Sequence, residues 1–194
     1  MALVLNGSND TITGLQINSA NIVDGSITSA DLASGVGGKI LQVVSTTQTS
    51  VSSVSVTTTD YENLGPTVTI TPSSSSNKIL ITSAFVVSSS TTNLNVDYRL
   101  IANGSLITAS YGDAVGSRKQ ATGTMEQNQS EACALLSVNF LHSPNTTSAV
   151  TYSFQVSHNS SSTRTIYLNR SADDSNNARM GRFASTITVM EVAA

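Results

Sequence analysis

The segment KILITSAFVV at residues 78–87 decides the fold class of this 194-residue chain. It is almost continuously apolar and rich in β-branched residues, and the tract Ser73–Ser76 just before it is a loop signal. A short apolar run bounded by turn residues is typical of a strand that is covered on both faces. We therefore expect residues 78–87 to form a central strand of a sheet.

Segments on both sides of this strand alternate between apolar and polar residues. In 94–100 the apolar residues alternate with Asn95, Asp97 and Arg99, and 150–156 alternates in the same way. Strict alternation predicts half-buried strands. Asn103-Gly104 separates two such segments, and this dipeptide favours a two-residue type I′ hairpin. The segments expected to be strands are 39–45, 54–56, 68–71, 78–87, 94–100, 105–111, 132–141, 150–156, 164–169 and 183–192.

About ten short strands at a spacing of roughly ten residues, with no helical periodicity, predict an all-β chain. The expected architecture is an antiparallel β-sandwich, with a jelly roll or a related Greek key as the leading topology. We interpret residues 112–130, which are polar and contain glycine, as a long loop or an excursion at a sheet edge. The order of the strands in the sheets does not follow from the sequence.

Composition excludes several classes of protein. Charged residues make up only 11% of the chain and hydrophobic residues 39%, in short alternating runs that distinguish it from a disordered linker. The nine basic residues are scattered, so we expect no nucleic-acid partner. No apolar run is long enough to span a membrane, and MALVLNG does not read as a secretory signal. The single cysteine, Cys133, is expected to be a small buried residue.

Residues 12–36 follow a different period. INSANIVDGS at 17–26 aligns with ITSADLASGV at 27–36, and an apolar anchor recurs every five residues. Neither a helix nor a strand has this period, and a single chain would leave the anchors exposed to water. We expect several copies of the chain to bury them around a shared axis; the alternative is a plain linker. The predicted anchors of this trimeric stalk are Ile12, Ile17, Ile22, Ile27 and Leu32.

The change from period five to period two defines three expected parts. Residues 1–11 form an N-terminal docking segment, and residues 12–38 form the extended stalk, ending in the Gly37-Gly38 hinge. Residues 39–194 form the β-sandwich head.

The sequence offers little catalytic chemistry. The only histidines, His142 and His158, lie near the ends of expected strands, and we interpret both as surface or rim residues. Asp173 and Asp174 could supply oxygen ligands to Ca²⁺, although the spaced D-x-D-x-D-G order is missing. The motif G-x-S-x-G is absent from the chain. We expect no catalytic residue, no cofactor and no metal, and therefore no enzyme.

Aromatic and basic residues indicate where a ligand could be contacted. Exposed aromatics and arginine are common in carbohydrate and receptor sites. Tyr111, Arg118 and Lys119 lie at or in the polar 112–130 segment, which is our expected contact loop. Tyr98, Tyr152 and Tyr167 fall in strand patterns and are expected in the core.

Several segments of the sequence resemble segments of known proteins. GKILQVVSTTQTS, VTITPSSSSNKILITSAFV and RFASTITVMEVAA resemble fibre-type virion proteins of tailed bacteriophages, especially marine and cyanobacterial phages. MALVLNGSNDTITGL and SITSADLA resemble the anchoring and shaft parts of such proteins. The resemblance implies a homotrimeric virion appendage with an N-terminal attachment, a stalk and a C-terminal β-sandwich head.

Two functions fit this resemblance, and a third is an outsider. In the first, the protein is a tail fibre whose N-terminus binds another virion protein and whose head contacts a host glycan or receptor. In the second, it is a capsid decoration, cement or head-fibre protein anchored to the major capsid protein. The outsider is a small polysaccharide-degrading spike. In each case the protein would be made in the host cytoplasm and would act on the surface of the phage particle.

Overall fold

The computed structural model describes residues 22–23, 26–28, 31, 39–57 and 60–194. The chain divides between Gly38 and Lys39 into two units, which are described separately. The expected docking segment, 1–11, and the anchors Ile12, Ile17 and Leu32 lie outside the described residues. Ile22 and Ile27 lie within them and are exposed, so the stalk remains a prediction.

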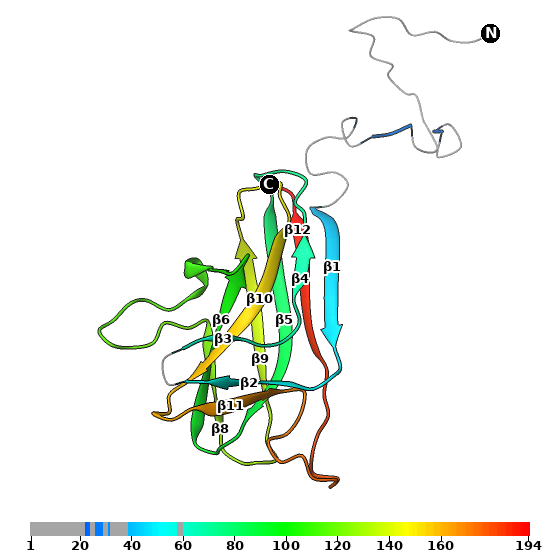
Figure 1. The fold of residues 1–194 in the computed structure, drawn as a ribbon. Coiled ribbons are helices and arrows are strands. Elements are labelled where there is room, and N and C mark those ends of the chain that lie inside the picture. Colours follow the sequence, from blue (N-terminus) through cyan, green and yellow to red (C-terminus); the bar gives the residue numbers. More distant parts are fainter. Residues whose placement is uncertain (1–21, 24–25, 29–30, 32–38, 58–59) are drawn as a thin grey trace, which may run out of the picture. The chain divides into compact units, whose positions relative to one another are not determined.

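The described part of residues 39–194 contains twelve strands, one short 3₁₀ turn (η3, Thr108–Ser110) and no α-helix (Figure 1). The strands are β1 (Ile40–Gln48), β2 (Ser52–Val56), β3 (Glu62–Asn63), β4 (Val68–Ile70), β5 (Lys78–Ser89), β6 (Leu94–Ala102), β7 (Ser105–Leu106), β8 (Gly123–Gln127), β9 (Ala134–His142), β10 (Val150–His158), β11 (Arg164–Leu168) and β12 (Ser185–Val192). The predicted all-β class is confirmed.

The strands form two antiparallel sheets, named here the β5 sheet and the β6 sheet after their central strands. In the β5 sheet, β9 pairs with one side of β5, and β12 and then β11 pair with the other side. β1 and β2 extend the sheet beyond β12 and β11. In the β6 sheet, β7 and β8 pair with one side of β6 and β10 with the other, and β3 and β4 follow the outer edge of β10.

The order of the strands is that of a jelly roll. Four pairs of short strands, β1–β2, β3–β4, β7–β8 and β11–β12, each act as one interrupted strand, because both members pair with the same side of a sheet. Numbered along the chain, the resulting eight strands run 1-8-3-6 in the β5 sheet and 2-7-4-5 in the β6 sheet. This is the double Greek-key order of an eight-stranded jelly roll. The leading topology expected from the sequence is therefore confirmed.

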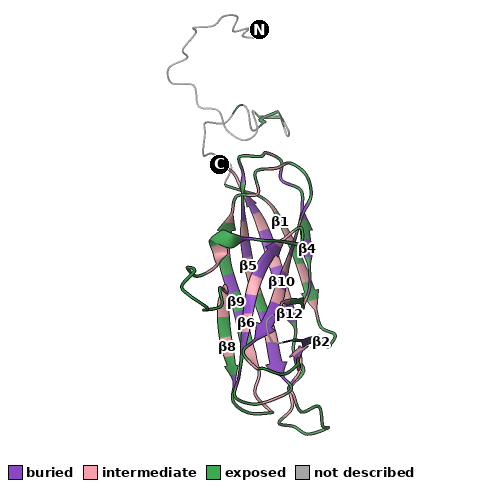
Figure 2. Cartoon of the chain, turned by 60° about the vertical axis from the view of Figure 1, so that its left-hand side comes forward, coloured by how far each residue is buried: buried purple, intermediate pink, exposed green. Residues whose placement is uncertain are grey.

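The core lies between the two sheets (Figure 2). The apolar residues of β6 and β10 that alternate with polar ones, including Leu100 and Tyr152, are buried on the inner faces. Phe85 of β5 meets Phe154 of β10 edge to face across the sandwich, with 4.5 Å between ring centroids. Contacts of this kind join the sheets through dense apolar packing.

Most strand predictions are confirmed, with four local differences. The segment 105–111, expected to be one strand, is a strand only at Ser105–Leu106 and continues as η3. β5 is central and paired on both sides, and Asn103 and Gly104 have the positive φ angles of the expected hairpin turn. The segment 112–130 contains an unexpected strand, β8, whose residues alternate only weakly in hydropathy. The two-residue strand β3 was also not expected. Tyr167 is half-buried rather than in the core, and its ring stacks with the Arg170 guanidinium.

The interpretation as a surface or rim residue was wrong for His158. His158 is fully buried; its Nε2 donates to the Val56 carbonyl at 2.8 Å, and its Nδ1 accepts from the Ser160 N–H. His142 is half-buried, and its Nδ1 lies 2.8 Å from the Tyr152 hydroxyl. The His158–Val56 and His142–Tyr152 hydrogen bonds each join β10 of the β6 sheet to a strand of the β5 sheet. The alternation of side chains along each strand turns both rings inward. The turn residues that follow each histidine in the sequence do not reveal this orientation.

The chain enters and leaves the sandwich at the same end. The Ala193 N–H donates to the Lys39 carbonyl at 2.8 Å, and Lys39 Nζ donates to the Ala194 carbonyl at 3.0 Å. We call this the entry end; the loop 71–77 and the Asn103-Gly104 turn lie there too (Figure 1). The opposite end carries the connections 90–93, 128–133, 159–163 and 169–184.

A buried carboxylate closes the entry end. Glu191 of β12 is 1% exposed and accepts hydrogen bonds from Gln42 Nε2 (2.6 Å), Asn77 Nδ2 (2.6 Å) and the Ser73 N–H (2.7 Å) and hydroxyl (2.8 Å). Burial alone would raise the pKa of this carboxyl, but the hydrogen bonds favour its charged form and lower the pKa to about 2. Glu191 thereby ties the loop 71–77 to β1 and β12.

We expect this interaction to make stability depend on pH. The pKa of Glu191 is lower in the folded chain (about 2) than in the unfolded one, so its contribution is complete above pH 4.5 and is lost as pH falls toward 2. Glu191→Gln should destabilise the fold by about 1.5–3 kcal/mol at pH 7, because a charge-assisted acceptor is lost. Urea unfolding measures both effects.

The control is Glu126→Gln on the exposed side of β8. The gap in unfolding free energy between wild type and Glu191→Gln should narrow from pH 5 to pH 2. A gap that stays constant over this range would contradict the assigned role of Glu191.

Candidate contact surface

The outer face of the β6 sheet carries a group of aromatic and cationic side chains. Arg99 lies on β6 between the buried Tyr98 and Leu100, so it points away from the core. Tyr61 precedes β3, and Tyr111 and Lys119 belong to the connection between β7 and β8. We name Tyr61, Arg99, Tyr111 and Lys119 the Tyr61 cluster.

The Tyr61 ring stacks against the guanidinium group of Arg99. Arg99 Cζ lies 3.7 Å from the centroid of the Tyr61 ring, and Arg99 Nε donates to Gln155 Oε1 at 2.9 Å. Lys119 Nζ lies 5.8 Å from the same centroid. Both distances fall within the range in which a cation is attracted to an aromatic ring. Burial raises the pKa of Tyr61, so its hydroxyl stays protonated at neutral pH.

Lys119 is held by oxygen atoms of two strands. Its Nζ donates to Ser157 Oγ at 2.8 Å and to the His158 carbonyl, and it lies 3.9 Å from Asp97 Oδ2. Partial burial lowers the pKa of Lys119, while the Asp97 carboxylate opposes the change. The ammonium group therefore works mainly as an anchor of its loop, with its side chain 31% exposed.

The two ends of the connection 111–122 are hydrogen-bonded to each other, and Lys119 anchors this loop to the sheet. The Gly112 N–H donates to the Ala121 carbonyl at 3.2 Å, and Gln120 Nε2 donates to the Gly112 carbonyl at 2.9 Å. The Tyr61 hydroxyl donates to the Gln120 carbonyl at 3.2 Å. Residues 113–118 beyond these contacts are all exposed. The loop thus has a fixed base and a free tip.

The structure separates the three residues expected in the contact loop. Tyr111 and Lys119 come together with Tyr61 and Arg99 at the base, whereas Arg118 lies in the exposed tip. Burial raises the pKa of Tyr111, and its hydroxyl is shielded from solvent with no hydrogen-bond partner in the described structure. Tyr61 and Arg99 were not predicted from the sequence as contact residues. The position of Arg99 on the solvent-facing side of an alternating strand could have identified it as one.

Asp173 and Asp174 belong to the opposite end of the sandwich. Asp174 receives two guanidinium groups, from Arg170 at 2.9 Å and from Arg182 at 2.5 Å, and Asp173 Oδ1 accepts the Ser175 N–H. The carboxylate oxygens of Asp174 therefore pair with arginine cations and are not arranged as in a calcium-binding loop. Within the described ranges, no three His, Cys, Asp or Glu side chains gather as a metal site would require.

Cys133 lies next to this arginine group and is half-buried, not fully buried as expected. Its thiol donates to the Arg170 carbonyl, with 3.3 Å between Sγ and O. Burial raises the pKa of the thiol, which keeps it protonated and unreactive.

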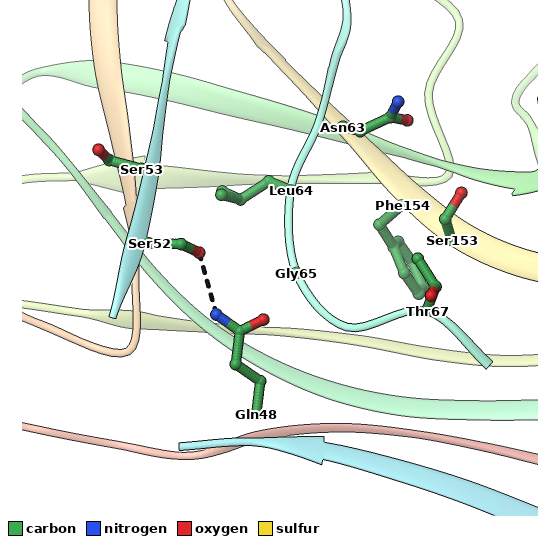
Figure 3. Close-up of a pocket in the computed structure, with 9 residues that line it drawn as sticks. All are labelled: Gln48, Ser52, Ser53, Asn63, Leu64, Gly65, Thr67, Ser153 and Phe154. Carbon is green, nitrogen blue, oxygen red and sulfur yellow. Dashed lines mark hydrogen bonds between the residues drawn. The ribbon is translucent and has the colours of Figure 1, made fainter. Parts of the chain in front are cut away.

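A cavity of 390 Å³ opens between the edges of the two sheets (Figure 3). It lies where Leu64–Thr67 interrupts the pairing of β3 and β4 with β10. Gly65 has a φ of +99°, and a Cβ there would lie 2.8 Å from Phe85, so this bend requires glycine. None of the lining residues is titratable; they are Gln48, Ser52, Ser53, Asn63, Leu64, Gly65, Thr67, Ser153 and Phe154. The cavity can accept a neutral polar group but offers no acid or base.

No protein-family model matches the sequence, and a search of curated proteins finds no match. Among solved structures, the chain is similar to the VP2 subviral particle of infectious bursal disease virus, with a TM-score of 0.39 and 10% identity over 78% of this chain and 41% of that one. The Gx strain of the same virus gives a TM-score of 0.37 and 12% identity, over 79% and 37% of the two chains. The chain spans less than half the length of these structures. No helix in the described residues is long and apolar enough to cross a membrane.

The geometry predicts that Lys119 fixes the loop. Lys119→Met keeps much of the side-chain length but removes the ammonium donors, so the hydrogen-bonded amides of Gly112 and Thr122 at the loop base should exchange at least about fivefold faster, as expected for the loss of about 1 kcal/mol. Arg118→Met in the exposed tip is the matched control and should leave exchange unchanged. Equal exchange in both variants would show that the loop does not depend on this anchor.

Proposed function

We propose that this chain is a non-enzymatic structural protein of a phage particle, a homotrimeric fibre that attaches through its N-terminal segment and contacts the host through its β-sandwich head. The observation that carries the proposal is the position of the entry end. Because residue 39 and the C-terminus lie at one end of the jelly roll, an attachment through residues 1–38 leaves the other end and the outer face of the β6 sheet free for contact. The segments of the sequence that resemble phage fibre proteins support the same function.

The Tyr61 cluster supports the contact role. It offers a stacked aromatic ring, a guanidinium group and a partly exposed ammonium group on the outside of the sheet. Such a set suits a glycan, whose ring stacks on tyrosine and whose hydroxyl or carboxylate groups accept hydrogen bonds from cations. Each site can be weak, since three copies per fibre and many fibres per particle raise the effective affinity.

Two places in the described part of the head, the cavity and the Asp174 group, lack paired acid and base groups, in keeping with a non-enzymatic role. The 390 Å³ cavity is lined without titratable residues. The acidic residue Asp174 is neutralised by two arginines. Glycoside hydrolysis needs two carboxyl groups at a fixed separation, and neither place provides them.

Labelling intact particles with an antibody raised against residues 39–194 tests the location. The fibre proposal predicts label on projections from the tail, away from the shell, in negative-stain images. Label spread over the shell would instead establish the capsid decoration role, and unlabelled particles would contradict a virion protein altogether.

Host adsorption tests the contact surface. In particles that carry Arg99→Ala, adsorption should fall by about tenfold or more, because truncating a central interface arginine typically costs 2 kcal/mol or more. The control is Arg179→Ala in an exposed turn at the opposite end. If both variants adsorb like the wild type, the Tyr61 cluster does not contact the host.

A further inference from the structure

The outer face of the β5 sheet carries less charge than that of the β6 sheet; the exposed Lys78 stands at its entry end, beyond the three rows described next. Its residues form rows that cross β1, β12, β5 and β9 in register. One row is apolar: Val43, Met190, Leu80 and Leu141. Two rows are hydroxyl- and amide-rich: Ser45, Thr188, Thr82 and Asn139, then Thr47, Thr186, Ala84 and Ser137. We name these three rows the neutral face.

The apolar row is open to solvent in the single chain. Val43 is 57% exposed and Leu141 is 46% exposed, at opposite edges of the sheet. Leu41, next to the row on β1, is 51% exposed. An apolar patch that crosses a whole sheet and is bordered by polar rows is typical of a surface that another protein covers.

From this we infer that the neutral face is the surface through which three copies of this chain pack their heads around a common axis. A second copy is the occupant that the charges favour. Two neutral faces can meet without repulsion between like charges and without burying an unpaired ion. The outer face of the β6 sheet carries Asp97, Arg99 and Glu126. Packing two such faces together would cost free energy through like-charge repulsion and through the burial of unpaired ions.

The chain path favours the same occupant. Residues 1–38 lead into β1 at Lys39, and β1 carries Leu41 and Val43 within its first four residues. The apolar row therefore lies at the entry end, where the stalk expected from the five-residue period would join the head. Three stalks on one axis bring three entry ends together, and the apolar rows are then the first surfaces of the heads to meet.

The size of the face favours a ring over a simple pair. With strands about 4.8 Å apart and a rise of about 3.4 Å per residue, four strands over Leu80–Val86 cover roughly 400 Å². A stable pair needs about 800 Å² from each partner. One face alone is therefore too small to hold a simple pair together, and the heads and the expected trimeric stalk are both needed to hold three chains. This inference rests on the homotrimer of the proposed function.

The test is the mass of the full chain at micromolar concentration, measured by light scattering. The wild type should have the mass of three chains. Thr188→Lys in the middle of the neutral face, and Val43→Lys in its apolar row, should each weaken the trimer at least about 100-fold and give the mass of one chain. Circular dichroism and thermal melting check that each variant is folded.

The matched control is Thr69→Lys. Thr69 and Thr188 are both strand threonines in cross-strand hydroxyl pairs of 2.7 Å, with Thr151 and Ser45 respectively, but Thr69 lies on the outer face of the β6 sheet. The control should remain a trimer. If a lysine variant fails to fold, the neutral double variant Val43→Ser with Leu141→Ser replaces it and should also dissociate.

Two results would overturn the inference in different ways. Folded neutral-face variants that remain trimeric would place the interface elsewhere and leave the fibre proposal intact. A wild type with the mass of one chain would overturn both the neutral-face interface and the homotrimer, while particle labelling would still report separately on the virion role.

Discussion

The structure depends on the burial of two inner sheet faces against each other. β5 is paired along both sides, and its residues Ile79, Ile81 and Phe85 face the alternating residues of β10 and β6. A shift of one residue in any of these strands would turn its apolar side chains toward water. The registers of the other strands follow from this constraint, because β12, β9 and β11 all pair directly with β5.

Polar groups inside the sandwich add specificity at places where the apolar packing ends. Glu191 holds the loop at the entry end, and His158 joins β10 to β2 near the opposite end. Each of these two buried groups makes a hydrogen bond to a distant part of the chain. A buried Glu191 or His158 without hydrogen-bond partners would destabilise the fold. Essentially one arrangement of the neighbouring loops supplies these partners.

Sequence reasoning recovered the features that depend on local pattern. The alternation of 94–100 and 150–156 and the Asn103-Gly104 turn report on neighbouring residues, and each was predicted correctly. The positions of His158, Tyr61 and Arg99 depend on which distant strands become neighbours, a fact set by the 1-8-3-6 and 2-7-4-5 orders. Tyr111 and Lys119 were anticipated because they share one loop; their partner Tyr61 lies some fifty residues earlier in the chain.

The two outer faces of the sandwich are chemically opposite, although both belong to antiparallel sheets of the same size. The β6 sheet exposes Asp97, Arg99 and Glu126 and supports a charged, aromatic loop base; the β5 sheet exposes hydroxyl groups and one apolar row. A sheet that only had to remain soluble would need no such division, since charge on both faces would serve solubility better. The division is what the proposed contact with a polar ligand and the proposed packing of neutral faces between copies would each require.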